Sequence, residues 1–167
     1  LAKSLGPGAP LGATDETARL AGFANPKMAE FINAAIEEGL KTPGAEEMTA
    51  KYRDGERKVE FDGGVYVRPT IVRCDNFSHP LANKEYLCPY ASVVEAPQKE
   101  VLSQIGYSLV VTAITRDPSF IAELQEFPLI DRLNIGPVST MKISWDQPHE
   151  GNMFEFLWQR RSIENGW

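Results

Sequence analysis

Residues 91–127, ASVVEAPQKEVLSQIGYSLVVTAITRDPSFIAELQEF, contain the pattern that decides the fold. Short apolar runs at 91–96 and 107–115 predict strands, and each is followed by a segment with helical spacing and a proline in its first turn. A further strand region follows at 131–145. Strands that alternate with helices at this spacing predict parallel pairing through right-handed crossovers.

The run LVVTAI, at 109–114, is almost continuously apolar, which predicts a strand that is covered on both faces. We therefore expect an α/β fold with three layers, αβα, and a mostly parallel sheet. The 167 residues suit one domain with a sizeable core, so we expect a single domain over residues 1–167.

Upstream, residues 25–41 predict an amphipathic helix with Asn25 as N-cap and Pro26 at the first helical position. Its apolar stripe is expected to pack in the core and not to bind a partner. The members of this stripe are Met28, Phe31, Ile32, Ala35, Ile36 and Leu40.

The next segments are more polar. Residues 42–60 predict a short helical turn and a strand start, and we expect their charged side chains to form a solvated face. Residues 62–74, DGGVYVRPTIVRC, predict a strand in which Pro69 marks an edge, a bulge or a kink.

Bulk composition excludes several classes of protein. The net charge of −6 and the pI near 5.0 argue against nucleic acid as a partner, because phosphate binding needs a basic face. No apolar run approaches the roughly 20 residues of a membrane span, and LAKSLGPGAP lacks the apolar core of a signal peptide. Two cysteines, Cys74 and Cys88, make no disulfide framework, so we expect a reduced, cytoplasmic domain.

Most motifs that carry chemistry are missing. No glycine-rich phosphate loop follows a strand, and there is no G-x-S-x-G elbow. His79 and His149 have no metal-ligand spacing, so both are expected to be turn or solvent-exposed histidines, and no metal site is predicted.

The stretch NKEYLCPY, at 83–90, holds the remaining candidates. Cys88 lies between Leu87 and Pro89, an apolar setting that favours an inert thiol over a nucleophile. Glu85 precedes a strand, where a carboxylate could accept hydrogen bonds from sugar hydroxyls. The residues alone favour the alternative, a solvated loop glutamate.

Five stretches in order resemble the C-terminal part of the catalytic domain in the aldehyde dehydrogenase superfamily. They span about residues 60–152 and read GVYVRPTIV, ANKEYLCPYASVV, GYSLVVTAITRD, IGPVST and QPHEG. The resemblance implies NAD or NADP as cofactor, with Glu85 accepting hydrogen bonds from the nicotinamide-side ribose and Leu87 packing near the nicotinamide. It further implies that a full-length protein oxidises an aldehyde to a carboxylate and can form a homo-oligomer.

By the same resemblance, the cofactor domain, the general-base glutamate and the nucleophilic cysteine lie before the start of this chain. We therefore expect no catalytic residue here and no activity from this chain alone. Departures from the family pattern leave an alternative open, a non-catalytic binding or assembly module with the same fold. They are Leu87 for phenylalanine, Cys88 for glycine, Met141 for asparagine, and His149-Glu150 in the P-F-G-G turn.

Overall fold

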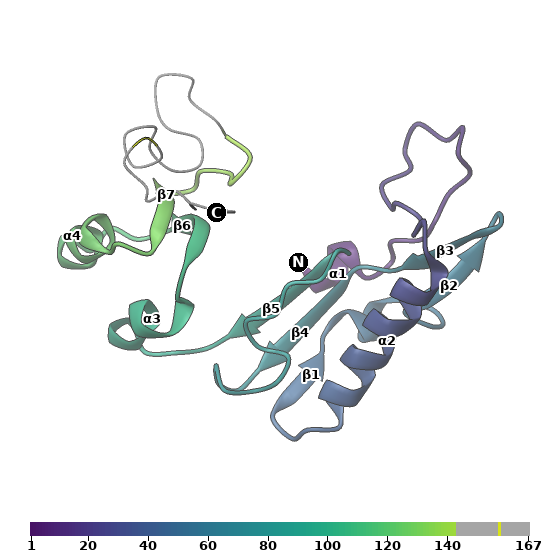
Figure 1. The fold of residues 1–167 in the computed structure, drawn as a ribbon, viewed down its shortest axis with the longest axis horizontal. Coiled ribbons are helices and arrows are strands. Elements are labelled where there is room, and N and C mark those ends of the chain that lie inside the picture. The colour runs from purple at the N-terminus through teal and green to yellow at the C-terminus, as the bar shows by residue number, and fades with distance from the viewer. Residues whose placement is uncertain (143–156, 158–167) are drawn as a thin grey trace, which may run out of the picture. The chain divides into compact units, whose positions relative to one another are not determined.

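The computed structural model describes residues 1–142 and Leu157, and these fall into two compact units, Leu1–Pro97 and a second that begins at Gln98 (Figure 1). Each unit has its own strands and helices. The single domain expected over residues 1–167 stays a prediction. Among the described residues, no helix is long and apolar enough to cross a membrane.

The first unit is built on a three-stranded sheet with β4 in its centre. The strands are β1 (Ala45–Glu47), β4 (Thr70–Cys74) and β5 (Tyr90–Val94). β4 pairs antiparallel with β1 and parallel with β5, so that Thr70 lies opposite Tyr90. β4 is buried at four of its five positions because it is flanked on both edges.

A hairpin of β2 (Lys58–Phe61) and β3 (Gly64–Val67) lies between β1 and β4 in the chain and forms a separate sheet. Its two-residue turn has positive φ at both positions, 49° at Asp62 and 73° at Gly63, as a type I′ turn requires. Pro69 lies between β3 and β4, so the single strand predicted over residues 62–74 is divided there. Proline cannot donate to a ladder, which explains the break.

Helix α2 (Pro26–Leu40) confirms the predicted amphipathic helix (Figure 1). The side chain of Asn25 accepts a hydrogen bond from the Lys27 N–H, which caps the helix. The expected stripe is only partly in the core. The buried positions of α2 are Ala29, Ile32, Ile36 and Gly39, so that only Ile32 and Ile36 of the expected stripe are buried. Met28 and Phe31 lie to one side of this line, and they are 44% and 67% exposed.

Two short helices complete the first unit, α1 (Ala2–Leu5) and the 3-10 helix η1 (Thr49–Tyr52). The hydrophobic core gathers around the end of β4 and the loop that follows it. Val72 and Cys74 pack there with Leu81 and Ala82.

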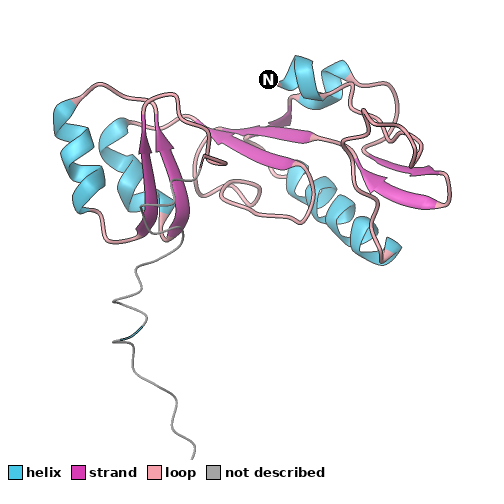
Figure 2. Cartoon of the chain, turned by 90° about the horizontal axis from the view of Figure 1, so that it is seen from above, coloured by secondary structure: helices cyan, strands magenta, loops and turns pink. Residues whose placement is uncertain are grey.

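The second unit is a strand–helix–strand motif preceded by a helix, and Figure 2 shows both helices beside the strand pair. Its elements are α3 (Gln98–Ile105), β6 (Ser108–Ala113), α4 (Pro118–Glu126) and β7 (Ile130–Ile135). β6 and β7 pair parallel, as predicted. Asp117 caps α4 by accepting hydrogen bonds from the backbone N–H groups of Ser119 and Phe120.

Two details of this unit differ from the prediction. β6 is not covered on both faces by the described residues, since Leu109 is 44% exposed, and Ile114, directly after the strand, is 78% exposed. The strand region expected at 131–145 ends at Ile135, because Gly136 turns the chain with a φ of 88°. Residues 143–145 lie outside the described residues.

The α/β class is confirmed, but the described residues do not confirm a three-layer arrangement with one mostly parallel sheet. They form three small sheets, in which two strand pairs are parallel and two are antiparallel. The antiparallel pairs involve β1 and β2, whose short polar sequences carry no strong strand signal.

Candidate functional site

The loop at 75–89 joins β4 to β5 and carries both candidate cofactor residues. It is fastened at its end, where the Thr70 N–H donates to the Pro89 carbonyl at 2.8 Å. Farther up, the Asn83 N–H donates to the Ser92 hydroxyl at 3.2 Å, and Asn83 has a φ of 51°. Residues 83–89 therefore form a turn that is hydrogen-bonded at one end to Ser92 of β5 and at the other to Thr70 of β4.

Glu85 and Leu87 project from this turn into solvent. Leu87 is 86% exposed, although it is apolar. Glu85 is exposed too, and its carboxylate makes no hydrogen bond or ion pair with any described residue. The residues between and after them, Tyr86 and Cys88, are half-buried. Because exposed and half-buried residues alternate, Glu85 and Leu87 lie on the same exposed side of the turn. Glu85 offers a carboxylate that accepts no hydrogen bond from a described residue, and Leu87 offers an exposed apolar side chain.

Two tyrosines, Tyr86 and Tyr90, pack against each other on the less exposed side of the turn. The rings of Tyr86 and Tyr90 meet edge to face, with centroids 4.9 Å apart and planes at 86°. The Tyr90 hydroxyl donates to the Leu81 carbonyl at 2.6 Å. Burial raises the pKa of Tyr90 far above its ordinary value, and Cys74, Tyr86 and Cys88 add to the shift, so the hydroxyl stays a donor.

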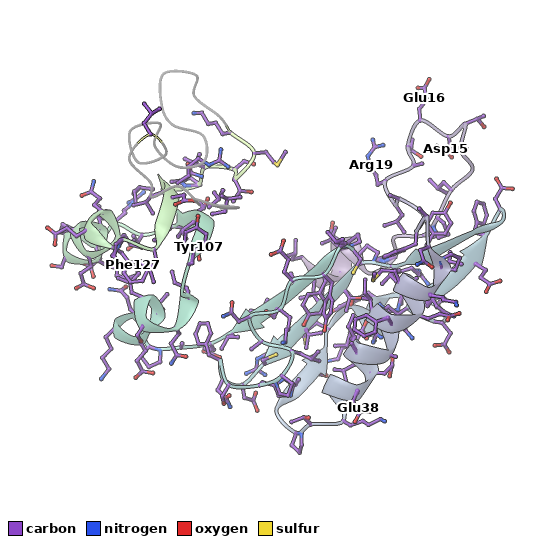
Figure 3. The ribbon with its side chains drawn as sticks, in the orientation of Figure 1. Asp15, Glu16, Arg19, Glu38, Tyr107 and Phe127 are labelled. Carbon is purple, nitrogen blue, oxygen red and sulfur yellow. The ribbon has the colours of Figure 1, made fainter. Side chains whose placement is uncertain are left out.

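Cys88 is half-buried beside an open groove of about 370 Å³. The groove is lined by Leu1 and Leu5 at the two ends of α1, by residues 69–71 and 88–91, and by Arg19. Figure 3 shows Arg19 in the loop before α2. Burial raises the pKa of the Cys88 thiol, and the distant charge of Arg57 opposes this only in part. Such a thiol is mostly protonated near neutral pH, as expected for an unreactive cysteine.

The position of the turn does not follow the general rule for open parallel sheets. That rule places ligands at the carboxyl ends of strands, whereas Glu85 and Leu87 lie at the amino end of β5. Their assignment as cofactor residues therefore rests on the resemblance and on their exposure, and it stays a prediction.

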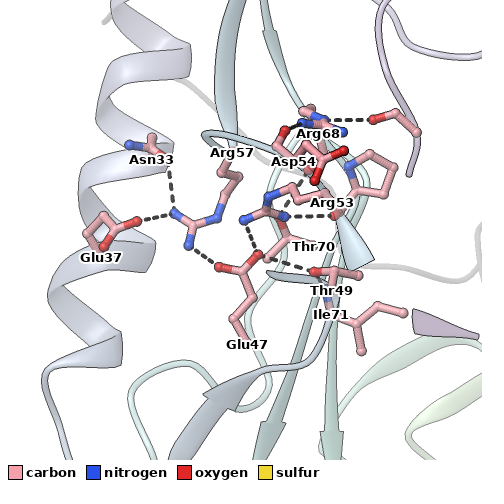
Figure 4. A network of polar contacts seen from close by, with 12 residues as sticks. Asn33, Glu37, Glu47, Thr49, Arg53, Asp54, Arg57, Arg68, Thr70 and Ile71 are labelled. Carbon is pink, nitrogen blue, oxygen red and sulfur yellow. Dashed lines mark hydrogen bonds and ion pairs between the residues drawn. The ribbon is translucent and has the colours of Figure 1, made fainter. Parts of the chain in front are cut away.

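Sequence reasoning missed a buried charge cluster in residues 42–60, where a solvated face was expected (Figure 4). Glu47 forms ion pairs with Arg53 and Arg57, and all three side chains are at most 7% exposed. Arg57 also donates to Asn33 at 2.9 Å and to Glu37 at 2.8 Å, both on α2. The prediction of a solvated face is wrong for these three residues, because the fold packs the segment against α2.

The cluster extends to the sheet through hydroxyl and backbone groups. Thr49 donates to Glu47 at 3.2 Å and accepts from the Ile71 N–H at 3.1 Å. Desolvation alone would raise the pKa of Glu47, but the ion pairs with Arg57 and Arg53 outweigh it and lower that pKa. The carboxylate is thus charged and fully engaged, which suits a structural role and not acid–base chemistry. No spacing or motif in the sequence distinguishes Glu47 from its exposed neighbour Glu46.

His79 lies in the turn-rich loop after β4, in line with the expectation of a turn histidine, but it is not solvent-exposed, since it is 6% exposed. Its Nδ1 accepts the Leu81 N–H at 3.1 Å, which leaves Nε2 to donate to the Thr42 carbonyl at 3.2 Å. The Cys74 thiol lies 3.7 Å from Nδ1, and burial, together with the charge of Asp75, raises the pKa of that thiol. The imidazole therefore organises the loop after β4. His149 and Glu150 lie outside the described residues.

Metal binding has no support in the part of the chain that the structure describes. Within it, no three His, Cys, Asp or Glu side chains are placed to hold a metal ion together.

No protein-family model matches the chain, and no curated protein sequence matches it. Solved structures do match. An indole-3-acetaldehyde dehydrogenase complexed with NAD+ aligns at 18% identity and a TM-score of 0.61, over 77% of this chain and 26% of that chain. Aldehyde dehydrogenase from Bacillus cereus aligns at 19% identity and a TM-score of 0.61, over 82% and 28% of the two chains. Lactaldehyde dehydrogenase from Escherichia coli aligns at 16% identity and a TM-score of 0.59, over 76% and 26%.

These matches confirm the resemblance to aldehyde dehydrogenases at the level of the fold. The chain spans about a quarter of the length of the solved structures that it matches.

Proposed function

We propose that this chain is the C-terminal portion of the catalytic domain of an NAD(P)-dependent, aldehyde dehydrogenase-like oxidoreductase. The full-length protein oxidises an aldehyde to a carboxylate, and this portion supplies part of the wall of the cofactor site. The observation that carries the proposal is the turn before β5. This turn exposes Glu85 and Leu87. It belongs to a fold that is shared with aldehyde dehydrogenases, and the sequence stretches that resemble that family follow one another in the family's order.

The exposed groups fit the nicotinamide half of such a cofactor. An ionised carboxylate only accepts hydrogen bonds, so Glu85 can take both hydroxyl donors of one ribose. Leu87 offers an apolar side chain two residues away, against which a flat ring can pack. The cofactor, when bound, supplies the acceptor for the hydride that leaves the aldehyde.

The described residues of this chain bind and orient but supply no nucleophile. Cys74 is fully buried, and the pKa values of both Cys74 and Cys88 are raised by burial. A covalent route through a thiol therefore needs a cysteine elsewhere in the full-length protein. The 167-residue chain by itself is expected to be inactive.

We also propose a reduced, cytoplasmic setting, since both cysteines are free. The net charge of −6 supports a protein that does not bind nucleic acid. Aldehyde and nicotinamide cofactor are the proposed partners, and homo-oligomer formation stays a prediction.

The test compares the full-length protein with this chain. NAD and NADP are titrated into both by calorimetry, and both are assayed with a panel of aldehydes. The full-length protein should bind cofactor and oxidise at least one aldehyde, and the chain alone should not. Glu85→Gln in the full-length protein should weaken cofactor binding by about tenfold, the effect of losing one charge-assisted hydrogen bond.

Glu95→Gln is the matched control, because Glu95 is an exposed glutamate just beyond the other end of β5. It should leave cofactor binding unchanged. If the full-length protein neither binds cofactor nor oxidises any aldehyde, the similarity to aldehyde dehydrogenases is one of fold alone. The non-catalytic binding or assembly module would then be the better description.

A further inference from the structure

Among the described residues, no hydrogen bond or ion pair fixes the Glu85 side chain, and Leu87 is 86% exposed. Glu85 is exposed too. A two-point contact with one ligand requires a constant separation between them, so the backbone of the turn must be held by its other residues.

Tyr86 is the residue between the two candidates, and its ring is held against Tyr90. The edge-to-face contact at 4.9 Å is a preferred geometry for aromatic pairs. Because residues 85 and 87 flank Tyr86 directly, fixing its ring also restricts the peptide bonds on either side of it.

Tyr90 is in turn joined to the core. Its hydroxyl donates to the carbonyl of Leu81, a residue that is 1% exposed and whose own N–H donates to His79. Tyr90 also belongs to β5, where it pairs with Thr70. Through Tyr90, the exposed turn is therefore connected to the buried core of the first unit.

Two short backbone hydrogen bonds complete the connection. The Cys88 N–H donates to the Tyr86 carbonyl at 2.7 Å, and the Tyr90 N–H donates to the Cys88 carbonyl at 2.7 Å. Each spans three residues, and the first makes Leu87 the apex of a tight turn. This explains how an apolar side chain comes to project into solvent.

We infer that Tyr86 and Tyr90 are positioning residues, whose paired rings and anchored hydroxyl hold Glu85 and Leu87 at the spacing that a nicotinamide ribose and its ring require. The inference rests on the proposed function for the identity of the ligand. The restraint on the turn itself is a property of the free protein and can be measured without any ligand.

The first measurement is amide hydrogen exchange on the full-length protein without cofactor. Tyr86→Ala should speed exchange at the Cys88 and Tyr90 amides by about tenfold or more, since local opening controls such exchange. The amides of β4 should be unchanged. Tyr86→Phe keeps the ring and should behave as the wild type. Unchanged exchange in Tyr86→Ala would overturn the inference, whatever the protein binds.

The second measurement is steady-state kinetics of the full-length protein. Tyr86→Ala should raise the KM for cofactor by about tenfold with little change in the KM for aldehyde, and Tyr86→Phe should restore it. Tyr90→Phe keeps the ring but loses the bond to Leu81, so it should raise the cofactor KM by a smaller factor. Tyr52→Phe is the control, because the Tyr52 hydroxyl has no hydrogen bond among the described residues.

The outcomes separate the two proposals. If wild type binds no cofactor but Tyr86→Ala loosens the turn, the proposed function fails and the positioning role stands as a property of the turn. If wild type binds cofactor and Tyr86→Ala leaves both exchange and cofactor KM unchanged, the positioning role is wrong and the proposed function stands.

Discussion

At the scale of single residues, Glu47 is a carboxylate enclosed by Arg53 and Arg57 in the first unit. Glu47→Gln keeps the size of the side chain but leaves two buried guanidinium groups without their counter-charge. Removing one partner of a buried ion pair costs about 3–5 kcal/mol. Urea unfolding of the variant should show a loss of this size in the free energy of unfolding.

Glu46→Gln is the matched control, because Glu46 is adjacent in sequence and pairs with Lys51 at the surface. It should change the free energy of unfolding very little. Equal losses for the two variants would contradict the structural role of the buried cluster.

The same residue makes stability depend on pH. The pKa of Glu47 in the folded state is lowered from its ordinary value of 4.5 by Arg57 and Arg53. Its contribution is therefore fully present above the unfolded pKa and is lost as pH falls from about 4.5 toward the folded value. When the free energy of unfolding is measured at decreasing pH, it should fall less steeply for Glu47→Gln than for the wild type.

Cys88 is expected to react slowly with iodoacetamide near neutral pH. Burial raises the pKa of its thiol, and the thiolate is the reactive form. Mass spectrometry should show alkylation several-fold slower than in the urea-unfolded chain, with a rate that rises above pH 9. Cys88→Ser isolates Cys74, which should react only on unfolding. Rapid labelling of folded Cys88 at pH 7 would support a catalytic or redox role instead.

At the scale of elements, α2 depends on a close approach at Gly39. A Cβ added there would lie 2.5 Å from Cδ2 and Cγ of Leu81, which is itself buried. Gly39→Ala should therefore lower the free energy of unfolding by about 1–2 kcal/mol, since overpacking outweighs the gain in helix propensity.

Gly12→Ala provides the comparison for this substitution. No heavy atom lies within 4 Å of a Cβ added at Gly12, so thermal unfolding should be unaffected. A stabilised Gly39→Ala variant would mean that Leu81 is not held against α2.

At the scale of the whole molecule, the described residues of the two units differ in how many hydrophobic side chains are buried. Leu124 is the one buried hydrophobic residue among the described residues of the second unit, whereas the first unit has a core around β4. Parallel strands are normally covered on both faces. We expect amides of β6 and β7 in the 167-residue chain to exchange at least about tenfold faster than those of β4. Equal protection of both units would contradict this.

Much of the local structure follows from sequence because its causes are local. Asn25 and Pro26 begin α2 and Asp117 caps α4, each through a few neighbouring atoms. Apolar periodicity is equally local, so the order of helices and strands in residues 91–135 could be read directly. The motif around Glu85 and Leu87 was also visible, although only by resemblance.

The tertiary structure decided which side chains are buried, because burial depends on what packs against a segment from elsewhere in the chain. From sequence, Glu47 and Arg57 resemble surface charges, but α2 packs against them in the fold. His79 resembles a solvent-exposed loop histidine, but hydrogen bonds with Leu81 and Thr42 hold it in a buried position. Conversely, the apolar run at 109–114 predicted a covered strand, yet Ile114 is exposed. Periodicity states which residues share a face, and only the folded chain supplies what lies against it.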